Sequence, residues 1–414
     1  MTADATQPGP ERLIAALQVS LYALLGAIAL ASLGIALPRA ARAQAAAAAP
    51  APGFTYGAAL QTQYDSNVQR VPEDGGAGSW VNQASLFAGF DRTYGRQHLT
   101  ASADIGRVLF KQLPLYNFTQ EDLRAGWGMD LPGTVDTQLD VTRSLNLAHF
   151  ADLNSVRRDV ISHTDLHGVV DFPVVSRWRV FVGDDAARQR NSNGTDVPAN
   201  VDTNEVDAGI GYQTGKENRI DLLARTVRAT YPDAQLATQS TLAVSPYRER
   251  GADLRVKWKF SGASTLTGRV GYVQRRNDLA TFPDFAGAAY DMTYLWQPTA
   301  RSSLTVLVLR QTGATGDNQY LSSVAHTYRL SPTYAATAKI QVQAQFELSQ
   351  FDYLPIASAP TRSDSVHSAG LGATWVPRRW ITVKIAQTWE QRASSLAVFD
   401  YLDRVSSLSL QATF

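Results

Sequence analysis

From residue 54 onward, apolar and polar residues alternate along the chain, with a period of two over long stretches. In residues 250–260, Leu254, Val256 and Trp258 share one face. Arg255 and Lys257 share the other. Because successive side chains of a strand point to opposite sides, this pattern predicts β-strands with one apolar and one polar face. These stretches run for about ten residues or more, long enough for a tilted crossing of a bilayer.

Short polar turns and longer loops alternate between the predicted strands. The turns are expected at 92–96, 131–134, 173–176, 215–218, 261–264, 297–300, 331–334 and 376–379, and most contain Gly or Pro. The loops are expected near 64–78, 111–118, 148–158, 190–203, 231–247, 277–286, 314–321, 352–364 and 394–402. This alternation predicts an all-β transmembrane, antiparallel, up-and-down β-barrel of about 18 strands, with the short turns on the periplasmic side.

The first 53 residues differ from the rest. Arg12 precedes an apolar run at residues 13–37, and small residues follow, with possible cleavage sites ending at Ala43 and Ala45. We interpret residues 1–43 as a signal peptide cleaved at about 43–45, residues 46–53 as an Ala/Pro-rich lead-in, and residues 54–414 as the barrel. The alternative is a retained transmembrane anchor, because about 20 apolar residues span a bilayer.

Composition narrows the possible functions. The net charge is +1, which gives no argument for binding nucleic acid. The chain has no cysteine, which excludes disulfides and cysteine zinc sites. Its mean hydropathy of −0.18 is compatible with a membrane barrel, because half of every strand faces water.

The chemistry of the polar residues indicates no catalytic site. His163 and His167 lie near Asp165 and Asp171, but positions two and four apart on a strand are about 7 and 13 Å apart, too far for one tetrahedral metal ion. The histidines lack metalloprotease spacing, and no Gly-x-Ser-x-Gly motif occurs. We therefore expect no enzyme activity, no metal and no cofactor.

The polar faces carry the candidate functional residues. The earlier strands supply the acidic residues Asp122, Asp136, Asp140, Asp165, Asp171 and Asp207. The later strands supply the basic residues Arg225, Arg255, Lys257, Lys259 and Arg269. In a closed barrel these would line the pore as an acidic wall opposite a basic wall, with a field that orients polar solutes. Alternatively, the charges pair with their neighbours and keep the lumen wet.

Two segments resemble a known family. The sequence ends on an amphipathic strand with Phe414 last, as the closing strand of outer-membrane barrels does. Near the first strand, Tyr64-Asp65-Ser66-Asn67-Val68-Gln69-Arg70 resembles the Tyr-Asp-(Asp/Ser)-Asn-apolar-x-Arg segment of the EpsL-type barrels of exopolysaccharide operons. The resemblance implies that Phe414 is an assembly signal. Asp65 and Asn67 are equally compatible with simple turn formation.

The resemblance implies a conduit for secreted exopolysaccharide in the bacterial outer membrane, reached by Sec-type export. The expected partners are membrane lipid, the barrel-assembly machinery, the polysaccharide and periplasmic or inner-membrane export components, but no nucleic acid. Two alternatives stay open: a general or selective porin for small polar solutes, and a structural or adhesive barrel with a blocked lumen.

The first prediction concerns location. Fractionation of a Gram-negative host should place the mature protein in the outer membrane, and N-terminal sequencing should find a start at about Gln44 or Ala46. Recovery from the inner membrane with residues 1–43 attached would instead support the anchor.

Overall fold

The computed structural model describes residues 53–72, 76–131, 135–152, 157–194, 199–214, 218–234, 244–280, 282–314, 320–355 and 360–414. The predicted signal segment and almost all of the lead-in lie outside these residues, so the expected cleavage stays a prediction. Within the described ranges, no helix is long and apolar enough to cross a membrane.

The described chain is built almost entirely from strands. They are β1 (Gly53–Asp65), β2 (Ser79–Tyr94), β3 (Gln97–Phe110), β4 (Phe118–Leu131), β5 (Val135–Leu147), β6 (Val160–Val175), β7 (Trp178–Asn191), β8 (Val201–Gln213), β9 (Arg219–Thr230), β10 (Tyr247–Ser261), β11 (Ser264–Asn277), β12 (Phe285–Thr299), β13 (Ser302–Ala314), β14 (Tyr320–Ala335), β15 (Ile340–Pro355), β16 (Arg362–Arg378), β17 (Ile381–Ser394) and β18 (Tyr401–Thr413). Short 3-10 helices occur in three loops: η2 (Pro114–Tyr116), η3 (Phe150–Asp152) and η6 (Ala397–Phe399).

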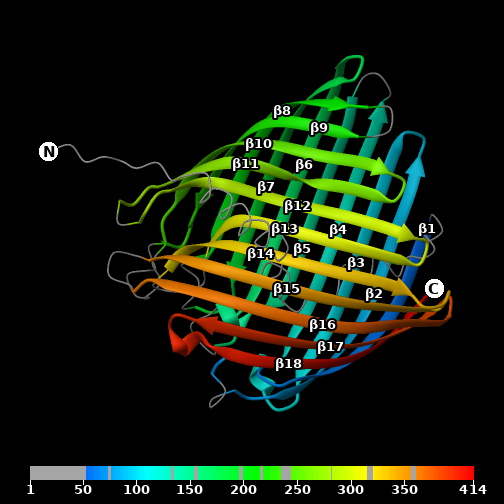
Figure 1. Ribbon diagram of the computed structural model, residues 1–414, viewed down its shortest axis with the longest axis vertical. Helices are drawn as coiled ribbons and strands as arrows, with labels where there is room; N and C mark the ends of the chain where they lie inside the picture. Colours follow the sequence, from blue (N-terminus) through cyan, green and yellow to red (C-terminus); the bar gives the residue numbers. More distant parts are fainter. Residues whose placement is uncertain are drawn as a thin grey trace, which may run out of the picture.

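All strands belong to one closed antiparallel sheet. The sheet has 18 strands, each pairing with its sequence neighbours, and β1 also pairs with β18. Figure 1 shows the barrel from its side, with β10–β18 crossing in front of the strands of the opposite wall. The predicted up-and-down barrel and its strand count are confirmed. Closure leaves no unpaired sheet edge, which a lipid environment would not tolerate.

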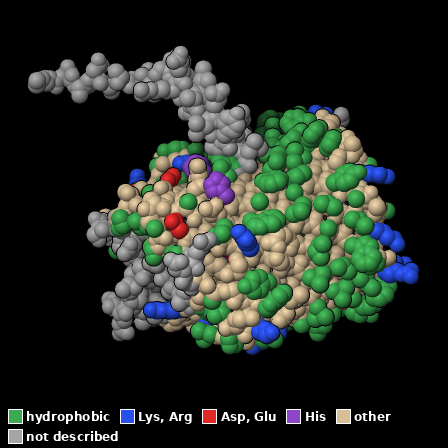
Figure 2. Space-filling model, turned by 60° about the horizontal axis from the view of Figure 1, so that its bottom comes forward, with side chains coloured by type: hydrophobic (Ala, Val, Ile, Leu, Met, Phe, Trp, Pro, Cys, Tyr) green, Lys and Arg blue, Asp and Glu red, His purple; other side chains and the backbone are tan. Residues whose placement is uncertain are grey.

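The two faces of each strand differ as the alternation predicts. On β1 the side chains of Phe54, Tyr56 and Leu60 are exposed on the outer surface. Gln61 and Asp65 belong to the opposite face, which lines the lumen. Figure 2 shows hydrophobic side chains spread over the outer wall, with very few acidic ones among them. Many outward aromatics lie near the short-turn end, as in the interfacial girdle of membrane barrels.

One predicted turn is wrong. Residues 331–334 are not a reversal but the last part of β14, and the chain turns at residues 336–339 instead. Pro332 pairs with Leu304 of β13, whereas the pairing with β15 skips from Leu330 to Thr333. A proline without an N–H is tolerated at such an interruption of the ladder. The tight turn is held by Thr337, whose hydroxyl accepts hydrogen bonds from the N–H groups of Lys339 and Ile340 at 3.1 and 3.0 Å.

Phe414 sits at the seam where the barrel closes. Its backbone N–H donates to the Tyr56 carbonyl at 2.8 Å, and its carbonyl accepts from the Tyr56 N–H at 3.0 Å. Its ring lies 5.8 Å from the rings of both Tyr56 and Trp380. The last residue therefore joins the first strand to the β16–β17 turn on the outer surface.

We predict that Phe414→Ser lowers the yield of folded barrel, because it removes two aromatic contacts worth about 1–3 kcal/mol together at the closing seam. The measurement is the folded fraction on a heat-modifiability gel after expression in a Gram-negative host. The matched control is Phe260→Ser on β10, since Phe260 is 61% exposed and Phe414 59%, and Phe260 lies away from the seam. Equal losses in the two variants would mean that position at the seam is irrelevant.

Candidate functional site

The lumen has one charged wall. The predicted acidic and basic residues all project from the face opposite the exposed apolar side chains, on strands β4–β8 and β9–β11 respectively. The two sets lie on adjoining strands and interleave where they meet. Arg255 and Asp207 join the two sets directly, whereas most of the other members pair with other charged neighbours on the same wall.

A ladder of alternating charge crosses β5–β9 near the short-turn end. Arg179 donates to Asp171 at 2.7 Å and also contacts Asp136. Arg219 contacts the other oxygen of Asp171 and donates to Asp221 at 2.6 Å. Because each guanidinium bridges two carboxylates on different strands, the ladder ties four strands together through charge-assisted hydrogen bonds.

A second charged group lies on the same wall, closer to the long-loop end, and centres on Arg225. Its guanidinium reaches Glu205 at 3.1 Å, Glu249 at 2.9 Å and Asp253 at 3.0 Å. Arg275 also pairs with Glu249, at 3.0 Å. These side chains are largely buried, so removing one member would leave a costly unpaired charge.

Arg255 and Arg269 flank this cluster and are more accessible. Arg255 lies 3.4 Å from Asp207, and Arg269 lies 3.9 Å from Asp253. Arg255 also stacks over the ring of Phe181, at 5.9 Å from its centroid, which adds a cation–π contact. Both arginine side chains have over a third of their surface exposed, so a solute in the lumen can contact them.

The remaining predicted residues are not brought together. Asp122 pairs with Arg124 at 3.0 Å, and Asp140 accepts from Gln138 at 2.5 Å. Asp165 lies on β6 without joining either charged group, and Lys257 and Lys259 are exposed on β10 towards the short-turn end. His167 bonds to Asp185 at 2.6 Å. No group of three or more metal-ligating side chains comes together among the residues that the structure describes.

Several glycines that the alternation pattern did not single out make room for these carboxylates. Each faces an aspartate on the neighbouring strand: Gly126 with Asp140, Gly183 with Asp207, Gly211 with Asp221, and Gly271 with Asp253. A Cβ at Gly271 would lie 1.8 Å from an Asp253 oxygen. The carboxylate therefore lies over the glycine backbone, in space that a larger side chain would fill. A glycine opposite an aspartate on the neighbouring strand marks such a position. The pair can be recognised only when the register between the two strands is known.

The opposite wall carries mostly amides and hydroxyls. On the lumen face of β15–β18 and β1 the side chains include Gln341, Gln343, Gln345, Thr374, Thr388, Ser407, Ser409, Gln411, Gln61 and Gln63. Charged side chains also occur on this face. Arg329 pairs with Glu347 at 2.9 Å, Lys384 lies on β17, and Asp364, Glu390, Arg392 and Asp403 gather at the long-loop end. In the middle of the lumen, a charged wall thus faces a mainly neutral polar wall.

The Tyr64–Arg70 motif shapes the long-loop end. The Asp65 carboxylate accepts from the Asn67 N–H at 3.0 Å and from Arg70 at 3.0 Å. Asn67 donates to the Val71 carbonyl at 2.7 Å and to the Leu402 carbonyl at 3.2 Å. Asp65 and Asn67 are therefore turn formers that also fasten the first loop to β18.

Arg70 also holds the first loop against the barrel wall. It pairs with Asp403 at 2.8 Å and lies 3.9 Å from Glu390. Burial alone would lower the pKa of Arg70, but the carboxylates of Asp65, Asp403 and Glu390 outweigh it and raise the pKa. The loop therefore keeps a permanent positive charge beside β17 and β18.

The β5–β6 loop folds into the mouth of the barrel. Phe150 packs with Tyr116, at 4.7 Å between ring centroids, within a buried apolar cluster that also includes Val68 and Phe110. Across the mouth, Arg392 of β17 donates to the carbonyl of Ala151 at 2.7 Å. Since β5 and β17 are not neighbours in the sheet, this contact spans the opening and narrows it.

Comparison with known proteins agrees with this architecture. Residues 248–414, from β10 to the last residue, match a family model described as "Putative beta-barrel porin 2". Solved structures with a similar fold include OpdK from Pseudomonas aeruginosa (10% identity, 87% of this chain and 99% of that chain, TM-score 0.47). Others are a BenF-like porin from Pseudomonas fluorescens Pf-5 (11%, 87% and 99%, TM-score 0.48) and OccK2 (OpdF) from P. aeruginosa in complex with glucuronate (10%, 87% and 98%, TM-score 0.48).

The chain is a closed antiparallel β-barrel of 18 strands, and its residues 248–414 are similar to a family of β-barrel porins. No curated protein matches the sequence. The matched family model is described as a porin, and none of the comparisons supports the resemblance to exopolysaccharide-operon barrels.

The loop in the mouth carries a pH-sensitive group. Burial of the ring, with the positive charges of Arg70 and Arg392 beside it, lowers the pKa of His149 to about 3. A released loop would have an ordinary histidine pKa of roughly 6.5. The docked loop therefore binds fewer protons between these values, and docking weakens as the pH falls below roughly 6.5.

We predict that loop 148–152 becomes accessible at acid pH, with the released-to-docked ratio rising by up to about tenfold per pH unit. Hydrogen exchange of this loop at pH 7 and pH 5 measures it. His149→Gln should abolish the pH dependence, whereas His98→Gln, at an exposed histidine paired with Asp91, should leave it unchanged. A loop that opens equally at acid pH in His149→Gln would refute the assignment.

Proposed function

We propose that this barrel is a porin for small polar solutes, rather than a conduit for a secreted polymer. The observation that carries the proposal is the lumen, in which a charged wall faces a mainly neutral polar wall. Such a lining is wettable along its length, and barrels of sixteen to eighteen strands leave an aqueous channel. The match of residues 248–414 to a porin family supports the same function.

The two walls suggest how a solute is selected. Arginine side chains with accessible guanidinium groups, such as Arg255 and Arg269, offer fixed positive charge on one side. The facing amides and hydroxyls offer hydrogen bonds. A small solute that carries both a charge and hydroxyl or amide groups can exchange its hydration water for contacts with both walls. An apolar solute makes no such contacts.

The loop in the mouth favours small solutes. Residues 148–152 are held from both sides, by the apolar cluster around Phe150 and by Arg392. A polymer of sugars would need this loop to move aside, and no comparison supports the polysaccharide function. The same loop fits the alternative of a blocked lumen, so conductance decides between a porin and a plugged barrel. Insertion by the barrel-assembly machinery after Sec-type export remains part of this proposal.

The proposal predicts discrete single-channel conductance in a planar bilayer. Arg392→Gln should increase it, because it removes the charge-assisted hydrogen bond to the Ala151 carbonyl, worth about 1.5–3 kcal/mol, and so frees the loop. Arg404→Gln, which removes an exposed arginine from the outer face of β18, is the control and should conduct like the parent. Absence of conductance in both the parent and Arg392→Gln would favour the blocked barrel.

Ion selectivity tests the charged wall separately. Lys257→Gln combined with Lys259→Gln should shift selectivity towards cations, since it removes two exposed positive charges from the lumen of β10 and leaves the carboxylates in place. Reversal potentials in a salt gradient measure this. Arg404→Gln again serves as the control, and a matching shift there would mean that the lumen charges do not set selectivity.

A further inference from the structure

A groove on the outer surface lies apart from the lumen. It has a volume of about 450 Å³ and runs across the long-loop end of β3–β7. Its lining includes the outward-facing side chains of Arg107, Thr119, Leu145 and Ser162, with Arg158 from the loop before β6 above them. Arg107 pairs with Thr119, and Leu145 pairs with Ser162, across neighbouring strands.

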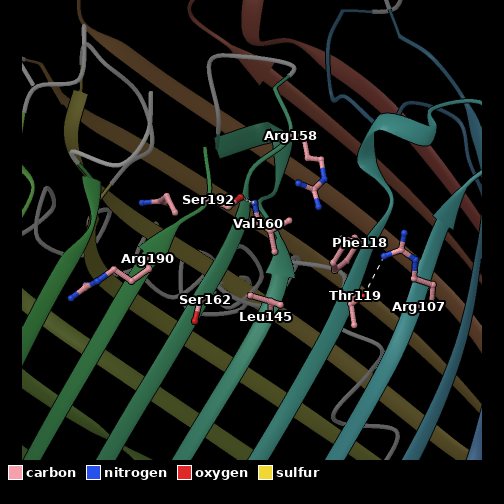
Figure 3. Close-up of a pocket in the computed structure, with 10 residues that line it drawn as sticks. Arg107, Phe118, Thr119, Leu145, Arg158, Val160, Ser162, Arg190 and Ser192 are labelled. Atoms are coloured by element: carbon pink, nitrogen blue, oxygen red, sulfur yellow. Dashed lines mark hydrogen bonds between the residues drawn. The ribbon is translucent and has the colours of Figure 1, made fainter. Parts of the chain in front are cut away.

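Two arginines of the groove are available to an anion. The Arg107 guanidinium donates to the Thr119 hydroxyl at 3.2 Å, and Arg158 donates to the Asn117 carbonyl at 3.4 Å. Neither lies within 4.0 Å of a carboxylate in the part of the chain that the structure describes. Figure 3 shows both side chains extending towards the space beside Phe118, whereas Arg190 turns away. Arg190 pairs with Asp202 at 2.7 Å.

The groove belongs to a wider basic band on the same outer face. Exposed arginines continue at this end of the neighbouring strands: Arg143, Arg188, Arg228, Arg248, Arg250 and Arg276. Acidic residues on this band are fewer. Glu121 lies 3.6 Å from Arg143, and Asp202 pairs with Arg188 and Arg190. The band therefore keeps an excess of positive charge, unlike an ordinary solvated surface of mixed sign.

The position of the band relative to the apolar wall matches the headgroup level of a membrane. On β10 the outward residues from Phe260 to Ala252 are apolar, and Arg250 and Arg248 follow. Phe260 and Arg250 are ten positions apart, roughly 33 Å along the strand. With a strand tilt of 35–45°, this is roughly 25 Å across the membrane, the height of the apolar band of such barrels.

We propose that the groove binds a phosphate group of a glycolipid in the outer leaflet. Two guanidinium groups approach from β3 and from the loop before β6, and the hydroxyls of Thr119 and Ser162 lie below them. This set of donors suits a phosphate, which accepts several charge-assisted hydrogen bonds. Leu145 provides an apolar floor for the lipid beneath its headgroup. Clusters of Lys and Arg at membrane level recognise anionic lipid in this way.

The experiment is native mass spectrometry of the full barrel in detergent. The probes are a bis-phosphorylated glucosamine-disaccharide lipid and the same lipid without its phosphates. The parent should retain the phosphorylated lipid in preference. The double substitution Arg107→Gln with Arg158→Gln should lower the apparent affinity by at least about tenfold, because the loss of even one charge-assisted hydrogen bond has an effect of this size.

The controls separate the groove from general surface charge. Arg404→Gln, on the outer face of β18, should bind like the parent, and Arg107→Lys with Arg158→Lys should recover part of the occupancy. Folding of each variant is checked by heat-modifiability. If the double variant does not fold, lipid binding is measured for the two single substitutions instead. Equal binding of the two lipids, or an equal loss in Arg404→Gln, would overturn the proposal.

A competition distinguishes a lipid site from a site for free phosphate. Inorganic phosphate at the same concentration should not displace the phosphorylated lipid, because the apolar floor and the bilayer level favour the lipid form. Displacement by inorganic phosphate would overturn the assignment to a lipid. Because the groove lies on the outer face, its variants should keep the conductance and selectivity of the parent. Failure of lipid binding can therefore be distinguished from failure of the porin function.

Discussion

Satisfaction of backbone hydrogen bonds in a medium without water is the constraint on which this structure depends. An open sheet of this size would present two rows of unpaired N–H and C=O groups to lipid, each costing several kcal/mol. Pairing of β1 with β18 removes both rows. The seam is reinforced at both ends, by Phe414 against Tyr56 and Trp380 at the short-turn end and by Arg70 with Asp403 at the long-loop end.

Closure also decides where the charges go. An outward charge in the apolar band would meet hydrocarbon, and most charged side chains of the strands accordingly lie in the lumen or at the ends of the band. Within the lumen they are close enough to pair, and Arg179, Arg219 and Arg225 each bridge carboxylates from more than one strand. The same residues therefore stabilise the wall and give the pore its polar lining. What remains accessible for a solute is the part of each guanidinium that its partner does not cover.

The two ends of the barrel are built differently. At the short-turn end the chain reverses within a few residues, and outward aromatics mark the membrane boundary. At the long-loop end, described residues of the loops after β1, β3 and β5 pack in an apolar cluster, and arginines occupy the outer rim. The narrowing of the mouth and the basic outer band arise from this one asymmetry, because only long loops can both reach across the opening and carry charge beyond the membrane.

The sequence by itself determined the strands, their number, the two faces and the assignment of charged residues to the lumen, because a period of two is a local property that survives in any register. It did not determine that Asp207 meets Arg255, that Gly271 makes room for Asp253, or that Ala151 reaches Arg392. Those contacts depend on the register and on loops that cross the opening. The turn expected at 331–334 failed for the same reason: Pro332 marks an interruption in a ladder, which only the neighbouring strand reveals. The groove at Arg107 and Arg158 likewise joins residues from strands and a loop that only the closed barrel brings to one level.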